Sequence, residues 1–325
     1  MTEITFRQAL QRGLREALDA DPDVFLMGED IGKYDGAYAV TQGLLEKYGP
    51  ERIRDTPISE AAFVGAGVGA AVAGLRPVVE LMSMSFSLVA SDQIVNMAAK
   101  IRYMSGGQVK VPMVLRAPTG GGVQLAATHS QSFENWYASV PGLKVVTPSN
   151  PYDALGLLRS SIEDDNPIIF AENALLYGTR GEVPDEEFRV PIGVADVKRA
   201  GTDITLVGWA HGVVTLLDAA DKLAETGVSA EVIDLRTLRP LDMDTVIASV
   251  EKTGRALVLD ENWRTGGLGS EIAAEIGYRS SDYLDGPVAR VGGTDTPAPY
   301  SRQLEQLGIP QTKWVIDEIE KTYGL

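Results

Sequence analysis

The sequence predicts an α/β protein with two domains, each built around a parallel sheet. Short apolar segments alternate with stretches of helical periodicity along most of the chain, which is the pattern of strands joined by crossover helices. A length of 325 residues is enough for two domains that each bury a core. With 44% hydrophobic and 23% charged residues, the composition is that of an ordinary globular protein.

The elements of the first domain follow from local patterns. Thr5 and Gln8 are placed to form a capping box at the start of an amphipathic helix, which four apolar residues predict: Phe6, Leu10, Leu14 and Leu18. Strands are expected over residues 24–27, 77–82, 111–116, 144–147 and 168–171. Further helices are expected near residues 43–48, 91–104 and 152–162. The glycine-rich stretch 118–122 predicts a flexible loop of the kind that serves active sites.

A change in composition marks the boundary between the domains. Residues 179–203 are charged, contain Pro184 and Pro191, and lack sustained periodicity, so we expect a linker there. A second α/β unit follows, with strands over residues 204–207, 230–233 and 256–259 and helices over 212–225, 244–252 and 270–276. The resulting division is a first domain over 1–180, a linker over 181–202 and a smaller second domain over 203–325.

The charge and the residue inventory exclude several classes of function. A net charge of −16 argues against binding to nucleic acid or an anionic membrane, and it favours a basic partner. The absence of cysteine removes disulfides, thiolate catalysis and zinc ribbons, and two histidines cannot form a histidine-cluster metal site. No uninterrupted apolar run approaches 20 residues, and no leader pattern is visible, so we expect no membrane span and a cytoplasmic location.

A segment of small residues gives the first candidate for a functional site. Residues 61–75 carry no charge, and Ser59 and Glu60 stand just before them, where a helix would start. A helix without a polar face is expected to be buried all round. Glu60 would then lie where a buried helix begins, and a carboxylate is costly there unless it is paired or functional. Taken by position alone, Glu60 is better explained as a helix-start carboxylate bonded to neighbouring amides than as a functional group.

The same segment loosely matches a dinucleotide-binding fingerprint, since Gly65, Gly67 and Ala70 have the required spacing. That fingerprint needs a strand directly before its first glycine, so that the pyrophosphate meets the start of the helix. Residues 56–60 do not form a strand pattern, and the glycines lie well inside the small-residue run. A nicotinamide-dependent reductase is therefore the weaker alternative.

Seven short motifs are spread along the chain: residues 28–30 (Gly-Glu-Asp), 54–60 (Arg-Asp-Thr-Pro-Ile-Ser-Glu), 103–107 (Tyr-Met-Ser-Gly-Gly), 129–131 (His-Ser-Gln), 141–146 (Pro-Gly-Leu-Lys-Val-Val), 235–242 (Leu-Arg-Thr-Leu-Arg-Pro-Leu-Asp) and 309–311 (Ile-Pro-Gln). Taken together and in this order, they resemble the beta subunit of the thiamine-diphosphate-dependent first component of 2-oxo acid dehydrogenase complexes, in a match that runs from near residue 4 to the end of the chain. The resemblance implies a transketolase-like fold with a pyrimidine-binding domain and a smaller C-terminal transketolase-type domain.

The resemblance also implies roles for particular residues. Glu60 would hydrogen-bond the pyrimidine ring nitrogen of thiamine diphosphate and favour the imino tautomer, whose nitrogen removes the thiazolium proton. Ile58, Met82 and Phe86 would line the pyrimidine pocket, and a stacked aromatic such as Phe86 adds roughly 1 kcal/mol beyond area burial. Without the resemblance, Phe86 would be taken as ordinary core.

His129 follows the glycine-rich loop, and the resemblance places this histidine in the active site, where it would assist acyl transfer to the lipoyl group. Imidazole suits that task because it both donates and accepts protons near neutral pH. A lone histidine is otherwise more often a surface residue. His211 is interpreted as structural.

A missing motif points to a partner. Family members that bind thiamine diphosphate in one chain carry a Gly-Asp-Gly segment that precedes the ligands of magnesium and diphosphate, and no such segment occurs here. Magnesium needs near-octahedral oxygen ligation, so the resemblance implies that an alpha subunit holds the magnesium and the diphosphate. We therefore expect an α2β2 assembly in which this chain alone is inactive.

Two further sites are implied by the resemblance. Potassium would be bound by backbone oxygens of Met113, Ser161, Ile162, Asp164 and Asn166, in a region that otherwise looks like a helix-ending loop. Asp285 and the carboxylate of Leu325 would meet the basic subunit-binding domain of the acyltransferase core, and the net charge of −16 suits a basic partner.

The expected activity is decarboxylation of a 2-oxo acid with reductive acylation of lipoamide. Pyruvate is favoured because residues 129–137 look more like pyruvate-type members, and branched-chain 2-oxo acids and acetoin stay open as substrates. A self-sufficient transketolase-type enzyme, a nicotinamide-dependent reductase and a non-catalytic scaffold subunit are the alternatives from other classes.

Overall fold

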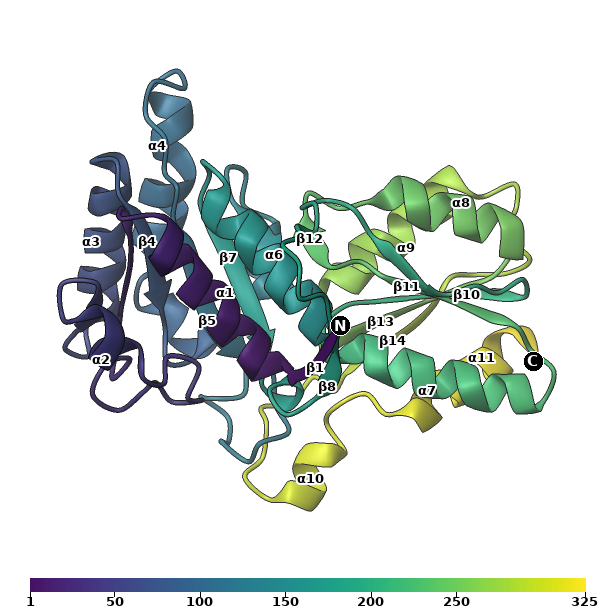
Figure 1. Cartoon of the computed structure of the whole chain (residues 1–325). Helices are drawn as coiled ribbons and strands as arrows, with labels where there is room; N and C mark the ends of the chain where they lie inside the picture. Colours follow the sequence, from purple (N-terminus) through teal and green to yellow (C-terminus); the bar gives the residue numbers. More distant parts are fainter. The chain divides into compact units, whose positions relative to one another are not determined.

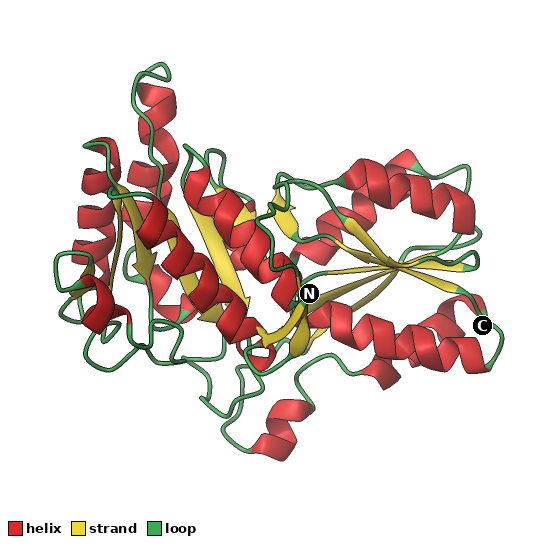
Figure 2. Ribbon diagram, viewed as in Figure 1, coloured by secondary structure: helices red, strands yellow, loops and turns green.

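The computed structural model describes all residues, Met1–Leu325, and the chain divides into two units (Figures 1 and 2). Unit 1 contains Met1–Thr119 and Trp136–Ile192, and unit 2 contains Gly120–Asn135 and Gly193–Leu325. The loop after residue 119, expected inside the first domain, therefore groups with unit 2. The α/β fold class predicted from the sequence is confirmed.

The centre of unit 1 is a parallel sheet with the strand order β6-β7-β5-β4-β2-β3. Its strands are β2 (Val24–Gly28), β3 (Ile53–Asp55), β4 (Arg76–Glu80), β5 (Val114–Thr119), β6 (Lys144–Val146) and β7 (Ile168–Asn173). Every residue of β5 and β7 is buried, as expected for central strands of a sheet with both faces covered. These strands therefore lack the alternation of polar and apolar residues that marks a half-exposed strand.

Helices α1 (Phe6–Ala20) and α6 (Pro151–Glu163) lie side by side on one face of this sheet (Figure 1). The predicted capping box is present, because Thr5 accepts from the Gln8 amide while Gln8 accepts from the Thr5 amide. Gly13 allows a close approach at the crossing, since a Cβ atom there would lie 3.1 Å from a Leu158 methyl group and would displace that side chain slightly. The remaining helical segments of unit 1 are α2 (Leu44–Tyr48), α3 (Glu60–Val72), η1 (Met84–Leu88), η2 (Gln93–Ala98), α4 (Ala99–Met104), α5 (Glu134–Ala138, which begins in unit 2) and η3 (Ala174–Leu176).

Helix α3 differs from its sequence-based expectation. It was expected to be buried all round, yet one side is exposed in this chain, at Ala61, Ala62, Ala66, Gly69 and Val72. The opposite side packs on the sheet, where a Cβ atom on Gly67 would lie only 2.6 Å from Val79. Alanine and glycine look apolar in the sequence but are tolerated on a surface, so the lack of a polar face does not establish complete burial.

The helix expected over residues 91–104 is confirmed, since all of these residues are helical, with the π-helical segment η2 leading directly into α4. One prediction of secondary structure is corrected. The expected linker contains two strands: β8 (Arg180–Val183) pairs antiparallel with β1 (Thr2–Thr5), and β9 (Asp196–Arg199) joins the sheet of unit 2. Both are four residues long, which is too short for a strand pattern to stand out.

Unit 2 contains a sheet with the order β14-β13-β10-β11-β9, in which only β9 is antiparallel to its neighbour. Its other strands are β10 (Ile204–Gly208), β11 (Ala230–Asp234), β13 (Ala256–Trp263) and β14 (Ala289–Gly293), with β12 (Thr237–Arg239) outside this sheet. Helices α7 (His211–Glu225) and α11 (Thr312–Tyr323) cover one face, and α8 (Met243–Thr253) and α9 (Leu268–Arg279) cover the other (Figure 1). The short α10 (Arg302–Gln306) precedes α11. None of these helices, nor any in unit 1, is long and apolar enough to cross a membrane.

Candidate active site

Several candidate site residues of unit 1 follow the strands at the carboxyl edge of its sheet. Strands β2, β3 and β4 are parallel neighbours, so their carboxyl ends lie at the same edge. Glu29 directly follows β2, the segment 56–60 follows β3, and Met82 follows β4. Open parallel sheets bind their ligands at this edge, which makes it the candidate site.

Glu60 is the first residue of α3 and is 6% exposed. Ser59 is the N-cap residue of α3, where the helix was expected to start, but its side chain makes no capping hydrogen bond. A carboxylate in the first turn of a helix is stabilised by the helix dipole. The fold therefore presents a nearly buried carboxyl group at the edge where a ligand would bind.

Glu29 forms a pair of carboxyl groups with Glu60. It is 5% exposed, and its Oε1 atom has no hydrogen-bond partner in the chain. Burial, followed by the negative charges of Glu60 and Asp30, raises the pKa of Glu29 to about 7. Glu29 is therefore partly protonated near neutral pH. The sequence showed Glu29 within a motif, but its pairing with Glu60 depends on the adjacency of β2 and β3.

A first prediction concerns the pH dependence of stability. Because the pKa of Glu29 is higher in the fold than in the unfolded chain, the folded state binds the extra proton, and stability falls as the pH rises from about 4.5 to about 7. We expect Glu29→Gln to be more stable than the wild type at pH 8 by about 1 kcal/mol, after allowance for solvent screening, and to show no such gain at pH 4.

Chemical denaturation of both proteins across this pH range measures the difference. The exposed Glu46, on α2, supplies a matched control as Glu46→Gln. If the free energy of unfolding of Glu29→Gln depended on pH in the same way as that of the wild type, the raised pKa of Glu29 would be contradicted.

The three apolar residues expected around the pyrimidine ring are at least partly exposed. Ile58 is 82% exposed and lies just after β3. Met82 and Phe86 are half-buried and follow β4, with Phe86 inside η1. Apolar side chains that remain accessible beside a buried carboxyl group fit a flat aromatic ring with a hydrogen-bonding nitrogen. The chain's residues therefore fit the pyrimidine part of thiamine diphosphate.

A buried ionic cluster crosses the same sheet and was not foreseen from the sequence. The Arg116 guanidinium donates to both carboxylate oxygens of Glu172, each at 2.7 Å, and also to Glu80. Tyr177 donates a 2.7 Å hydrogen bond to Glu172. Burial lowers the pKa of Arg116, but the charges of Glu172 and Glu80 outweigh it and raise that pKa overall. The cluster links β4, β5 and β7 through their side chains.

The residues expected to bind potassium lie around the amino ends of β5 and β7. The carbonyls of Ile162 and Asp164 accept hydrogen bonds of 3.0 and 3.4 Å from Arg76. The Met113 carbonyl accepts from the Ile168 amide at 2.9 Å. Each of these three carbonyl oxygens already accepts one hydrogen bond and has a second lone pair. The chain contains no cluster of three or more His, Cys, Asp or Glu residues that would hold a metal.

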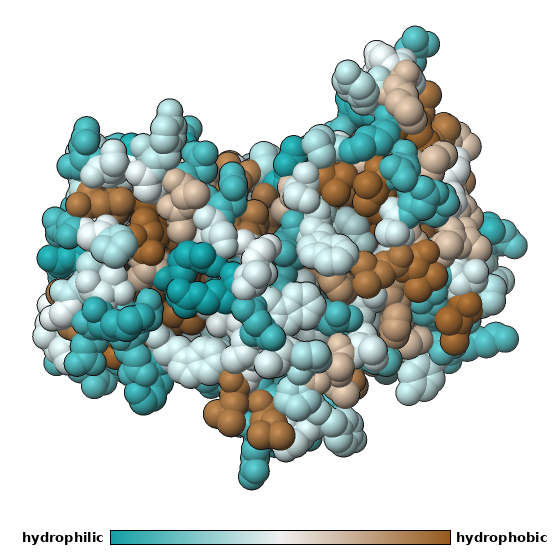
Figure 3. Space-filling view, turned by 180° about the vertical axis from the view of Figure 1, so that it is seen from behind, coloured by the Kyte–Doolittle hydropathy of each residue, from teal (hydrophilic) through white to brown (hydrophobic).

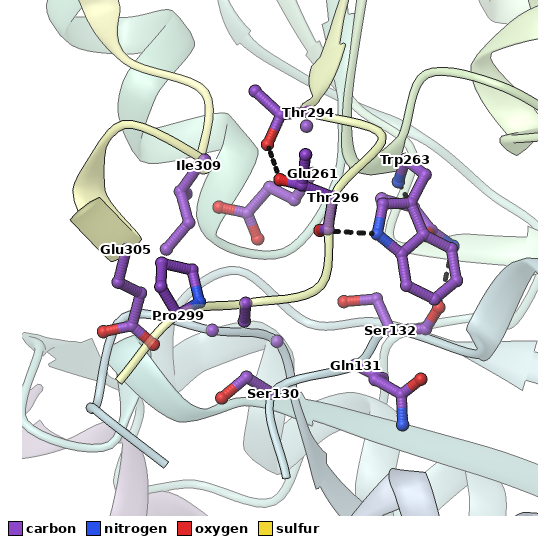
Figure 4. A pocket seen from close by; sticks show the side chains of 16 residues that line it. Ser130, Gln131, Ser132, Glu261, Trp263, Thr294, Thr296, Pro299, Glu305 and Ile309 are labelled. Atoms are coloured by element: carbon purple, nitrogen blue, oxygen red, sulfur yellow. Dashed lines mark hydrogen bonds between the residues drawn. The ribbon is translucent and has the colours of Figure 1, made fainter. Parts of the chain in front are cut away.

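His129 lies in the part of the chain that groups with unit 2. It is exposed, and its Nδ1 atom lies 2.9 Å from the Thr128 hydroxyl. The loop that carries it borders a small pocket of about 60 Å³, enough for a few water molecules (Figure 4). In Figure 4, Glu305 and Ile309 lie on one side of this pocket and Trp263 on the other. The remaining lining residues are Gly120, Gly121, Ser130, Gln131, Ser132, Glu261, Asn262, Gly293, Thr294, Thr296, Ala298, Pro299 and Gly308.

His211 also lies in unit 2, where its Nδ1 atom is 2.8 Å from Glu261. Burial lowers the pKa of His211, but the charge and hydrogen bond of Glu261 outweigh it, so the pKa is raised. Asp285, expected at a partner contact, is exposed and forms an ion pair with Arg255 at 3.2 Å. Leu325 is partly buried.

The family comparisons agree with this architecture. Residues 2–179 match the transketolase pyrimidine-binding domain, and residues 193–315 match the transketolase C-terminal domain. Among solved structures, a split-gene transketolase described as an inactive beta4 tetramer superposes with a TM-score of 0.80 at 24% identity, over 99% of both chains. The class is therefore transketolase-like, and the expected fold is confirmed.

Relatives define the family more narrowly. Beta subunits of the pyruvate dehydrogenase E1 component are 51% identical in Arabidopsis thaliana (subunit beta-1, mitochondrial; 97% of this chain, 88% of that protein) and 48% identical in Rickettsia bellii (98% of each). The mitochondrial beta subunit of Homo sapiens is 48% identical over 99% of this chain and 91% of that protein. The chain belongs to the family of pyruvate dehydrogenase E1 component beta subunits, which confirms the resemblance seen in the sequence.

Proposed function

We propose that the chain acts with an alpha subunit to decarboxylate pyruvate and to transfer the acetyl group to lipoamide. The observation that carries the proposal is the nearly buried Glu60 at the start of α3, beside the accessible apolar residues that follow β3 and β4. The full-length similarity to beta subunits named for pyruvate dehydrogenase supports pyruvate as the substrate.

Thiamine diphosphate, when bound, would supply a nucleophilic carbon for addition to the 2-oxo group and a thiazolium ring that takes up the electron pair left when carbon dioxide departs. Glu60 holds a proton against the pyrimidine ring nitrogen, and Ile58, Met82 and Phe86 enclose the ring and exclude water from it. The magnesium ion and the diphosphate belong to the alpha subunit in this proposal, because the chain lacks the Gly-Asp-Gly segment.

His129 serves the second half of the reaction. When one lipoyl sulfur takes the acetyl group, the S–S bond breaks and the other sulfur leaves as a thiolate. His129 donates a proton to that thiolate, which its exposed position on the loop allows. His129→Gln should therefore slow acetylation of a lipoyl domain far more than pyruvate-dependent reduction of an artificial electron acceptor, and equal losses in both assays would contradict this role.

The surface supports an α2β2 assembly bound to an acyltransferase core. In Figure 3, hydrophobic residues gather on one face of unit 1 near the projecting end of α4. Large exposed side chains of this region include Val72, Met97, Tyr103 and Met104. Asp285, which is exposed, and Leu325 are proposed to meet a basic domain of the core, and the net charge of −16 favours that encounter. We expect the assembly to work in the cytoplasm, although some relatives are named as mitochondrial.

Potassium is proposed to bind the backbone oxygens of Met113, Ser161, Ile162, Asp164 and Asn166. We expect 100 mM potassium chloride to raise the melting temperature of the chain by a few degrees above its value in 100 mM sodium chloride, because an ion bound only by the fold stabilises it. Differential scanning fluorimetry at matched ionic strength measures the effect. Equal melting temperatures in the two salts would show that potassium does not bind at this proposed site.

The test of the function compares the chain alone with the co-expressed alpha and beta pair. With thiamine diphosphate and magnesium present, we expect 2-oxo-acid-dependent reduction of an artificial acceptor only by the pair, and fastest with pyruvate. Higher activity with branched-chain 2-oxo acids or acetoin would assign those compounds, and not pyruvate, as the substrate. Activity of the chain alone would contradict a cofactor site that is divided between the alpha and beta subunits.

A further inference from the structure

The loop that carries His129 is fastened to the rest of unit 2 by one buried carboxylate. Glu305, on α10, is 1% exposed, and its two oxygens accept hydrogen bonds from the Gly122 amide at 2.9 Å and the Gln124 amide at 3.0 Å. These amides are the only hydrogen-bond partners of the Glu305 side chain. The two hydrogen bonds of this carboxylate therefore both go to main-chain amides of the same loop. They stabilise the position of the loop, because charge-assisted hydrogen bonds are about twice as strong as neutral ones.

The backbone of the loop is strained and requires stabilising contacts. Gln124 and Ala126 have φ values of 60° and 62°, in the left-handed region that costs energy for residues with a side chain, and Gly122 has a φ of 99°. The loop also packs closely on the same side of the pocket, since a Cβ atom on Gly121 would lie 3.3 Å from Ile309 and 3.6 Å from Glu305. By accepting from the Gly122 and Gln124 amides, the Glu305 carboxylate stabilises the backbone just before His129, where Gln124 and Ala126 have left-handed conformations.

The other end of the loop is fastened as well. The Asn262 side chain, 5% exposed, donates a 2.7 Å hydrogen bond to the Ser132 carbonyl. Phe133 meets Trp263 edge to face with ring centroids 6.3 Å apart. His129 therefore lies between two fixed points, at Gly122–Gln124 and at Ser132–Phe133, and both are supplied by unit 2.

We propose that Glu305 is a positioning residue for the reaction, and that its carboxylate sets the place of His129 by holding the Gly122 and Gln124 amides. The inference rests on the proposed role of His129 in acetyl transfer. It assigns to the C-terminal unit a part in the reaction at the lipoyl group, separate from subunit contacts. Glu305 does not touch the reacting atoms and acts only through the loop.

The test uses the assembled alpha and beta pair with Glu305→Gln. Glutamine keeps the size of the side chain and one accepting oxygen, but it turns an NH₂ group toward one of the two amides, so one hydrogen bond is lost with little change in packing. Glu225→Gln, at the exposed end of α7, is the matched control. Amide hydrogen exchange of residues 120–132 is measured together with lipoyl-domain acetylation and acceptor reduction.

We expect Glu305→Gln to raise exchange by about tenfold at one of the two amides, Gly122 or Gln124, the effect of one lost hydrogen bond. Acetylation of the lipoyl domain should fall by about tenfold in kcat, and acceptor reduction should fall far less. Unchanged exchange, or equal losses in both activities, would overturn the proposal. If the wild-type pair showed no activity on pyruvate, the proposed function would fail instead, and the exchange rates would still decide whether Glu305 holds the loop.

Discussion

Replacing Glu60 by glutamine is expected to lower the pyruvate-dependent activity of the assembled pair by about two to three orders of magnitude, the usual range for loss of a general acid or base. Glutamine matches the size of the side chain but cannot deliver a proton to a ring nitrogen. The fold should survive, because the residue keeps its place in the first turn of α3 and loses a charge that Glu29 already opposes.

The effect is measured as kcat for acceptor reduction, with saturating thiamine diphosphate and magnesium. Glu46→Gln, on the exposed side of α2, controls for loss of one negative charge. Binding of thiamine diphosphate is followed in parallel, since the carboxyl group also contributes to affinity. Full activity in the Glu60→Gln pair would leave the scaffold alternative as the better account of this chain.

The second large effect is on stability. Arg116→Met should destabilise unit 1 by about 3–5 kcal/mol, because Glu172 and Glu80 are then left buried without a cation. Burial raises the pKa of Glu80 even beside Arg116. The corresponding fall in melting temperature is on the order of 10 °C for a unit of this size.

Two further variants separate charge from packing. Arg116→Met combined with Glu80→Gln and Glu172→Gln should recover most of the loss, since no unpaired charge remains. Arg180→Met breaks an exposed ion pair with Glu3, 3.1 Å long, and should change stability by less than about 1 kcal/mol. Equal melting temperatures for Arg116→Met and Arg180→Met would show that the cluster contributes no more than a surface pair.

Local chemistry made part of the fold predictable. The capping box of α1 depends on two residues three positions apart, and the apolar strands β5 and β7 are buried on both faces, so each was visible in a short window of sequence. Strands β8 and β9 were missed because strands of four residues carry little pattern. Strand β14 and helices α10 and α11 were not predicted either.

The candidate site also contains residues that the sequence predicted and residues that it did not. Glu60 stood out because it precedes an uncharged helix, and the surrounding motifs pointed to thiamine diphosphate. The pairing of Glu29 with Glu60, the cluster around Arg116 and the hold of Glu305 on the loop all join residues distant in the sequence. Glu305 accepts from Gly122, 183 positions away, and no local pattern announces such a bond.

The order in which the chain visits the two units limits how the protein can be divided. Unit 1 is left at Thr119, entered again at Trp136 and left finally at Ile192, so the histidine loop is an insertion encoded within the gene segment for unit 1. A fragment ending at residue 192 would carry His129 without Glu305 and Asn262, and a fragment starting at 193 would carry these residues without the loop. Exchanging the C-terminal halves of two relatives therefore replaces the residues that hold the loop. In such a chimaera, the histidine comes from one parent protein and the residues that position it come from the other.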